Sequence, residues 1–151
     1  MNTDTFNKNY KSTPYFRLEN PNPRWAKKRG YTWDTCDCAI RALANATSCS
    51  WLDAFDFLTE RARRDFSIVN DGKSYTRWMK EAGCDWVYCK PVKGKKRMTC
   101  QEFAETHKKG RYIVYIANHF TACVDGVLLD AFNPGEYAVI GYYDMADFKV
   151  R

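Results

Sequence analysis

The chain has 151 residues, enough for one domain with a sizeable core and too few for two comfortable ones. Its hydrophobic content of 45%, with 16% aromatic residues, is typical of a globular protein. No apolar run approaches the roughly 20 residues that a membrane helix needs, so we expect no membrane partner. The net charge of +6 permits an acidic partner, protein or nucleic acid, without requiring one.

The number of cysteines indicates the cellular compartment in which the protein works. There are seven, an odd number, and residues 1–16 contain no apolar core like that of a signal peptide. This usage is typical of reduced thiols in a cytosol, so we expect cytoplasmic localisation.

Residues 1–30 are predicted to form an irregular N-terminal arm, because prolines interrupt any helical pattern there. The aromatic residues of this arm lead us to expect that it packs against the rest of the protein, through Tyr15, Phe16 and Trp25. The remaining residues, 31–151, are predicted to form a single domain.

A buried helix is predicted after Tyr31. The capping residue types Thr35 and Asp37 precede a run of Ala, Ile and Leu that ends near Thr47. The segment is apolar around most of its circumference, which is the mark of a buried helix.

A second helix is predicted from Trp51 to about Phe66. Ser50 and Asp53 resemble a capping box at its start. Apolar residues recur at helical spacing up to Phe66, so we expect that side chain to face the core.

Two shorter helices follow. Ser74 is expected to cap the first, which stops at Gly83, and Thr99 with Glu102 fits a capping box for the second, which Gly110 ends. Strands are predicted at 85–92, 112–116, 120–132 (as a hairpin) and 137–143. Helices therefore come first and an antiparallel sheet second, which predicts an α+β fold.

The hairpin is the most informative stretch. Asp125-Gly126 favours a two-residue type I′ turn, which places Val124 opposite Val127. Side chains alternate between faces, so one side carries His119, Thr121, Cys123, Leu128, Asp130 and Phe132. The other side is entirely apolar and suits a core: Phe120, Ala122, Val124, Val127, Leu129 and Ala131.

His119 and Asp130 become diagonal neighbours in this register, about 7–8 Å apart between backbones. A histidine beside a carboxylate is an oriented base, and Cys123 on the same side could line a cleft with it. The candidate nucleophile is Cys38, in the first turn of the buried helix, where unpaired N–H groups and the helix dipole stabilise a thiolate.

The order of Cys38, His119 and Asp130 along the chain resembles that of the papain-like cysteine peptidase superfamily. DCAIRALA at Asp37–Ala44 is similar to the D-C-x-x-R-A signature of small papain-fold proteins of phages and bacteria. HFTACVDGVLLDAFNP, from His119 onward, is similar in layout to the matching half of double-glycine leader peptidases.

The resemblance implies a papain-like fold and a cysteine-dependent acyl-transfer enzyme, a peptidase or isopeptidase acting on a protein or peptide. Cys38 would be the nucleophile, His119 the general base and acid, and Asp130 the group that orients the imidazole. No cofactor is implied. For a phage protein, the compartment would be the host cytoplasm.

The chain departs from papain at the oxyanion hole. The superfamily's glutamine, six residues before the cysteine, is replaced by Thr32. Thr32, Thr35 or an asparagine of the arm would have to act as the second donor beside the Cys38 backbone. Cys36 is the alternative nucleophile, but it aligns with the core positions of the helix.

Other interpretations stay open. A papain-fold module without activity could bind a protein partner. A basic segment of the chain contains Lys90, Lys93, Lys95, Lys96 and Arg97. It could contact an acidic substrate or, together with Trp86 and Tyr88, nucleic acid. Structural zinc is disfavoured, because the cysteines form no C-x₂-C pair and the chain has only two histidines.

Overall fold

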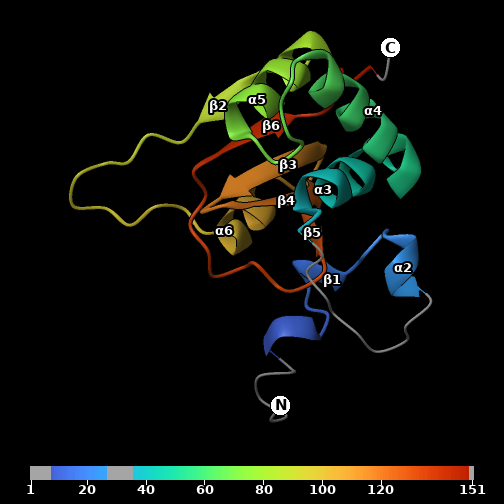
Figure 1. Ribbon diagram of the computed structural model, residues 1–151. Helices are drawn as coiled ribbons and strands as arrows, with labels where there is room; N and C mark the ends of the chain where they lie inside the picture. The colour runs from blue at the N-terminus through green and yellow to red at the C-terminus, as the bar shows by residue number, and fades with distance from the viewer. Residues whose placement is uncertain (1–7, 27–35, 150–151) are drawn as a thin grey trace.

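A computed structural model describes residues 8–26 and 36–149 of the chain. This part folds into five helices and one six-stranded mixed sheet, with strand order β1-β5-β4-β3-β6-β2 (Figure 1). The predicted α+β class is confirmed. The predicted antiparallel sheet is wrong in one respect, because β1 runs parallel to its neighbour β5.

Along the described part of the chain, β1 is followed by four helices, then by β2 and α6, and finally by four strands. The helices are α2 (Pro23–Ala26), α3 (Cys38–Thr47), α4 (Trp51–Arg64), α5 (Gly72–Glu81) and α6 (Cys100–Thr106). The strands are β1 (Phe16–Leu18), β2 (Trp86–Tyr88), β3 (Arg111–Ile116), β4 (His119–Val124), β5 (Val127–Asp130) and β6 (Gly141–Asp144).

The β4–β5 hairpin has the predicted register. Val124 pairs with Val127 and Cys123 with Leu128. Asp125 and Gly126 have φ values of 49° and 79°, as a type I′ turn requires at both central positions. The Asp-Gly pair therefore fixes which side chains of β4 and β5 share a face.

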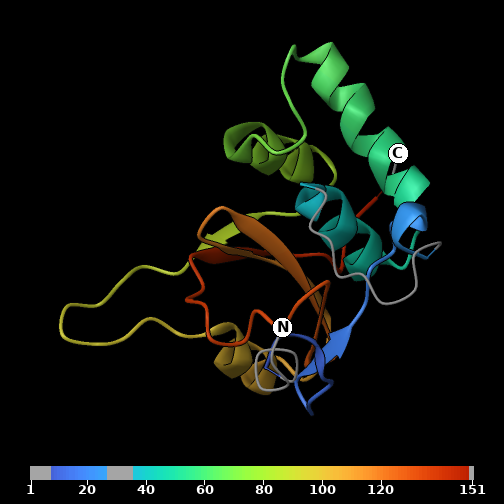
Figure 2. The ribbon, with the colours of Figure 1, turned by 60° about the horizontal axis from the view of Figure 1, so that its bottom comes forward.

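The two faces of the sheet are both covered, which makes three layers (Figure 2). Helices α3, α4 and α5 pack on one face, where Phe120, Ala122 and Leu129 belong to the core as predicted. Helix α6 covers the other face, where Cys123 and Leu128 are fully buried in a second core. The expectation that Cys123 lines a cleft is therefore wrong.

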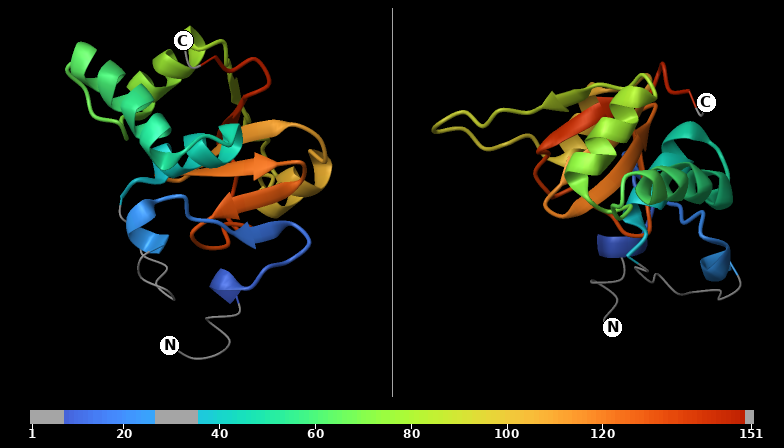
Figure 3. Two further views of the ribbon diagram at one scale, coloured as in Figure 1. Left: turned by 90° about the vertical axis from the view of Figure 1, so that its right-hand side faces the viewer. Right: turned by 45° about the horizontal axis from the view of Figure 1, so that its top comes forward.

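The N-terminal segment contributes to this second core. Strand β1 lies at the edge of the sheet beside β5 (Figure 3), and Phe16 is 0% exposed. Leu128 N donates to Tyr15 O at 2.7 Å, and Glu19 N donates to Asp130 O at 2.9 Å. Residues 16–18 are thus a strand within the predicted irregular arm. The structure does not describe the side chain of Trp25.

Helix α4 opens as predicted and ends earlier than predicted. Ser50 and Asp53 form the capping box. The helix stops at Arg64, and Phe66 follows in a left-handed conformation with φ 52°. Its side chain is 99% exposed, so the expectation that Phe66 faces the core is wrong.

The bounds of the later elements also shift by a few residues. Asp71, rather than Ser74, caps α5, and Gly83 follows its end as predicted. Thr99 and Glu102 form the capping box of α6, which ends at Thr106 instead of Gly110. Strands β2 and β6 are shorter than expected, because regular pairing between them covers only three residues of each.

Candidate active site

His119 and Asp130 face each other from neighbouring strands. His119 Nε2 lies 2.6 Å from Asp130 Oδ2, and both residues are buried. The second carboxylate oxygen, Oδ1, accepts a hydrogen bond from Ala131 N at 2.7 Å. The ring of Phe132 lies against the imidazole, with centroids 4.9 Å apart. The carboxylate is therefore fixed on both oxygens, and it fixes the imidazole in turn.

Cys38 approaches the same imidazole from α3. It is the first residue of that helix, and its side chain lies close enough to His119 to raise the pKa of that imidazole. Both residues line a cavity of about 310 Å³, together with Cys36, Asn70 and Asn118 among others. Because Asp130 occupies Nε2, the nitrogen left for the thiol is Nδ1.

The electrostatics of the imidazole follow from these neighbours. Burial lowers the pKa of His119, but hydrogen bonds to Asp130 and the Cys38 side chain, together with their charges, raise it to about 9. The ring is therefore protonated at neutral pH. An imidazolium next to a thiol favours the thiolate form, which is the nucleophilic one.

Asp37 anchors the start of α3 through a buried network. Its Oδ2 accepts hydrogen bonds from Asn22 Nδ2 at 2.7 Å and from Trp51 Nε1 at 2.8 Å. Its Oδ1 lies 3.0 Å from Arg41 Nε, and both side chains of this ion pair are buried. Asp37 thus links the segment at Asn22 to α3 and α4 immediately before Cys38, instead of capping the helix with its side chain.

The sequence carried a signal for this network that the prediction did not use. Asp37 and Arg41 are four residues apart, the spacing at which helical side chains meet. They lie at the start of a helix that is otherwise apolar around most of its circumference, where an unpaired charge would be costly.

The other candidate site residues are placed differently. Thr32 and Thr35 lie outside the described residues. Cys36 is exposed, has φ 58°, and its carbonyl accepts a hydrogen bond from Asn70 Nδ2 at 2.8 Å. Of the asparagines in the arm, Asn20 keeps a buried side-chain N–H with no partner among the described residues.

Three further cysteines are packing residues. Cys84, Cys100 and Cys123 are buried. Burial raises the pKa of the Cys84 thiol to about 11 and that of Cys123 to about 12, and it also raises the pKa of Cys100. These thiols are inert near neutral pH.

The basic segment lies apart from the Cys38–His119 cavity. It projects between β2 and α6, on the side away from α3 (Figure 1). Tyr88 is 54% exposed, but the Trp86 ring packs inward near Tyr143, with centroids 5.0 Å apart. Of the two aromatic residues expected to serve a nucleic-acid site, only Tyr88 is exposed.

Within residues 8–26 and 36–149, no three His, Cys, Asp or Glu side chains gather as metal ligands. The same residues include no helix with the length and apolarity to span a bilayer. Comparisons with protein-family models, curated proteins and solved structures find no match to this chain. The geometry around His119 is therefore the feature of the protein that points to a function.

Proposed function

We propose that this protein is a cysteine-dependent acyl-transfer enzyme with a papain-like fold, a peptidase or isopeptidase whose catalytic residues are Cys38, His119 and Asp130. The observation that carries the proposal is the position of the imidazole. It lies 2.6 Å from a buried carboxylate, and it lines the same cavity as the helix-start thiol of Cys38. A nucleophile, a base and an orienting group in this order are the parts of a triad.

The proposed reaction begins with the Cys38 thiolate, whose sulfur attacks the carbonyl carbon of an amide or isopeptide bond. The imidazolium of His119 donates its Nδ1 proton to the leaving amine as the C–N bond breaks, which leaves a thioester on Cys38. The neutral imidazole then takes a proton from water, whose oxygen attacks the thioester. The acid is released, and the thiolate–imidazolium pair forms again.

The oxyanion that forms in both steps needs hydrogen-bond donors. The backbone N–H of Cys38 is one, because the first N–H groups of a helix have no partner within it. Thr32 or Thr35 remain our proposed second donors, with the unpaired amide of Asn20 as the alternative from the arm. Loss of one such donor typically costs about 10²–10³ in rate.

The proposed substrate is a protein or peptide in the cytoplasm. The basic segment, with Lys90, Lys93, Lys95 and Lys96 exposed, would attract acidic stretches of that substrate by long-range electrostatics. Nucleic acid is a less favoured partner. Because the Trp86 ring points inward, only Tyr88 remains near the basic segment to stack on a base.

Alkylation by iodoacetamide tests the proposal. We expect the intact protein to be labelled fast at Cys38 below pH 7, whereas an ordinary thiol with a pKa of roughly 8.5 reacts slowly there. Peptide mass spectrometry identifies the labelled cysteine. Cys38→Ala should abolish fast labelling, His119→Ala should slow it, and Cys36→Ala should leave it unchanged.

Three other outcomes would contradict the proposal. If Cys36→Ala abolishes labelling and Cys38→Ala does not, the nucleophile is Cys36. If neither variant matters, the protein is not a cysteine enzyme, and an inactive papain-fold module that binds a protein partner becomes the better interpretation. Binding to nucleic acid that weakens steeply with salt would favour a nucleic-acid-associated protein instead.

A further inference from the structure

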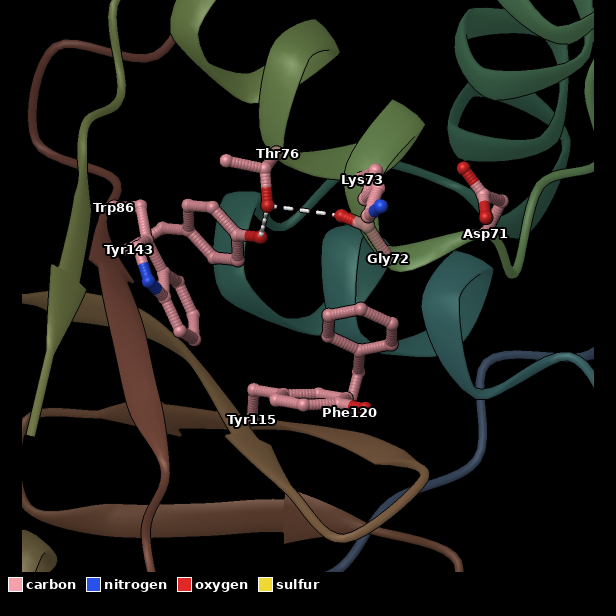
Figure 4. A pocket seen from close by; sticks show the side chains of 8 residues that line it. All are labelled: Asp71, Gly72, Lys73, Thr76, Trp86, Tyr115, Phe120 and Tyr143. Carbon is pink, nitrogen blue, oxygen red and sulfur yellow. Dashed lines mark hydrogen bonds between the residues drawn. The ribbon is translucent and has the colours of Figure 1, made fainter.

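A second, larger cavity adjoins the one that contains Cys38 and His119. It has a volume of about 660 Å³, within the range of small-molecule sites (Figure 4). The two cavities share Tyr115 and Phe120 as lining residues. Its lining residues come from the turn before α5 (Asp71), from α5 (Gly72, Lys73 and Thr76) and from the sheet.

The walls of this aromatic pocket are four rings from four strands. Trp86 on β2 lies 5.0 Å from Tyr143 on β6 and 6.2 Å from Tyr115 on β3, measured between ring centroids. Tyr115 in turn lies 4.9 Å from Phe120 on β4. Figure 4 shows these rings turned toward a common space below the start of α5. An edge or face of an aromatic ligand could pack against each of them.

Gly141 leaves room for the Trp86 ring in this position, because it has no Cβ. The space that a Cβ of Gly141 would occupy is filled by the six-membered edge of the Trp86 ring. The ring therefore lies directly on the backbone of β6. A wall that is already fixed before a ligand arrives loses little conformational entropy on binding.

Three polar side chains of the pocket, Thr76, Tyr143 and Asp71, are already paired within the protein. Thr76 Oγ1 donates to Gly72 O at 2.9 Å, so Tyr143 Oη must donate to Thr76 Oγ1 across their 2.7 Å contact. The Asp71 carboxylate caps α5 by accepting from Ser74 N at 2.9 Å. Apolar surface, to which the four rings contribute, exceeds polar surface in the rest of the lining, which favours a mainly apolar ligand.

We infer that the aromatic pocket binds a large apolar side chain, preferably an aromatic one, of the peptide whose neighbouring carbonyl is attacked by Cys38. This inference rests on the proposed function, because the shared lining by Tyr115 and Phe120 places the pocket beside the reacting bond. The substrate class is therefore a peptide with an aromatic residue next to the cleaved or transferred acyl group.

Two reagents that differ in one side chain test this inference. N-acetyl-phenylalanine chloromethyl ketone and N-acetyl-alanine chloromethyl ketone carry the same electrophile, and the rate of Cys38 alkylation is followed by intact mass. We expect the phenylalanine reagent to react at least about tenfold faster, the gain from burying a benzyl group. Iodoacetamide, which has no side chain to bind, reports the reactivity of Cys38 alone.

Trp86→Ala and Tyr88→Ala form a matched pair of variants. Both shorten an aromatic residue of β2, but only Trp86 lines the pocket. We expect Trp86→Ala to lose most of the preference for phenylalanine, taken within each protein as the ratio of the two ketone rates. Tyr88→Ala should keep both this ratio and the wild-type rate with iodoacetamide. Equal rates for the two ketones in the wild-type protein, with fast iodoacetamide labelling, would overturn the inference and leave the proposed function intact.

A binding measurement separates the failure of the function from that of the pocket. If iodoacetamide labels Cys38 no faster than a free thiol, the proposed function fails. Titration of the wild-type protein with N-acetyl-phenylalanine amide, followed through the indole N–H signal of Trp86 by NMR, then tests the pocket directly. A saturable shift that N-acetyl-alanine amide does not produce supports the pocket. No shift rejects it.

Discussion

At the scale of single residues, His119 combines two features that oppose each other. A buried imidazole ordinarily loses its proton, because burial disfavours the charged form. Here Asp130 and the Cys38 side chain more than offset that cost, and the pKa of His119 rises to about 9. The charge on the imidazole therefore depends on the Asp130 carboxylate, and a substitution of Asp130 tests this dependence.

Asp130→Asn should make stability depend on pH differently from the wild type. Because the pKa of His119 is raised from 6.5 to about 9, its imidazolium stabilises the folded state fully below pH 6.5. That stabilisation, at most about 3 kcal/mol, is lost as the pH rises through 9. We expect the difference in unfolding free energy between wild type and variant to be largest near pH 6 and to shrink toward pH 9.

Urea unfolding at pH 6, 7.5 and 9 checks this expectation. Burial keeps the thiols of Cys84, Cys100 and Cys123 protonated in both folded proteins up to pH 9, and they ionise alike in the unfolded chains, so their contribution cancels in the difference. A difference that stays constant across this range would show that Asp130 does not hold the charge of His119.

Asp37 is the second residue whose removal should be costly. Its carboxylate pairs with the guanidinium of Arg41, and both side chains are buried. Removing one member of a buried ion pair costs about 3–5 kcal/mol, because the other charge stays buried. We therefore expect Asp37→Ala to lower the unfolding free energy by about that amount, measured by urea denaturation.

Glu136→Ala is the control for this change. Glu136 forms a 3.0 Å ion pair with Lys8, with side chains 74% and 65% exposed. An exposed pair of this kind contributes less than about 1 kcal/mol. If Asp37→Ala costs no more than Glu136→Ala, the network around Asp37 does not anchor α3.

At the scale of elements, the hairpin turn does more than join β4 to β5. A Cβ on Gly126 would lie 2.9 Å from Lys108 Cδ and 3.1 Å from the backbone oxygen of Ala104. The turn is therefore packed against α6, and Gly126 is needed there for space as well as for its positive φ.

Gly126→Ala and Gly94→Ala separate these two needs. Both glycines have nearly the same φ, 79° and 80°, but a Cβ on Gly94 would meet nothing within 4 Å. Strain in the left-handed region costs about 1–2 kcal/mol in either place. We expect Gly126→Ala to lower the unfolding free energy by at least about 1 kcal/mol more, measured by thermal or urea unfolding. Equal losses would mean that the contact with α6 relaxes freely.

Local signals explain which elements were predictable. The Asp-Gly turn and the two capping boxes act within a few residues, so the sequence predicted the hairpin, α4 and α6 well. Strand β1 was missed because three residues among prolines show no alternation. Its pairing with β5 links segments more than a hundred residues apart, and no local pattern reports such a contact.

The candidate site divides in the same way. His119 and Asp130 belong to one hairpin, and its turn predicts their shared face. The aromatic pocket, by contrast, combines Trp86, Tyr115 and Tyr143 from three strands whose order in the sheet the sequence did not predict. The second core was missed because His119, Thr121 and Asp130 made that side of the hairpin look polar, while Cys123 and Leu128 between them are fully buried.

At the scale of the whole molecule, the N-terminal segment completes the layer opposite α3. Phe16 packs in the second core with Phe103, Val114 and Leu128, on the same face as α6. The backbone of this segment also bonds to β5 next to Asp130. Its attachment therefore bears on the sheet that positions the candidate site, although it lies far from His119 and Asp130 in the sequence.

Phe16→Ala and Phe66→Ala test how strongly this segment is integrated. The two changes remove the same side chain, which is 0% exposed at Phe16 and 99% exposed at Phe66. Removing a buried phenylalanine costs about 3–5 kcal/mol through lost burial and the cavity left behind. A fully exposed one should cost less than about 0.5 kcal/mol. We expect a large drop in melting temperature for Phe16→Ala alone; two variants that melt with the wild type would show that the segment does not stabilise the domain.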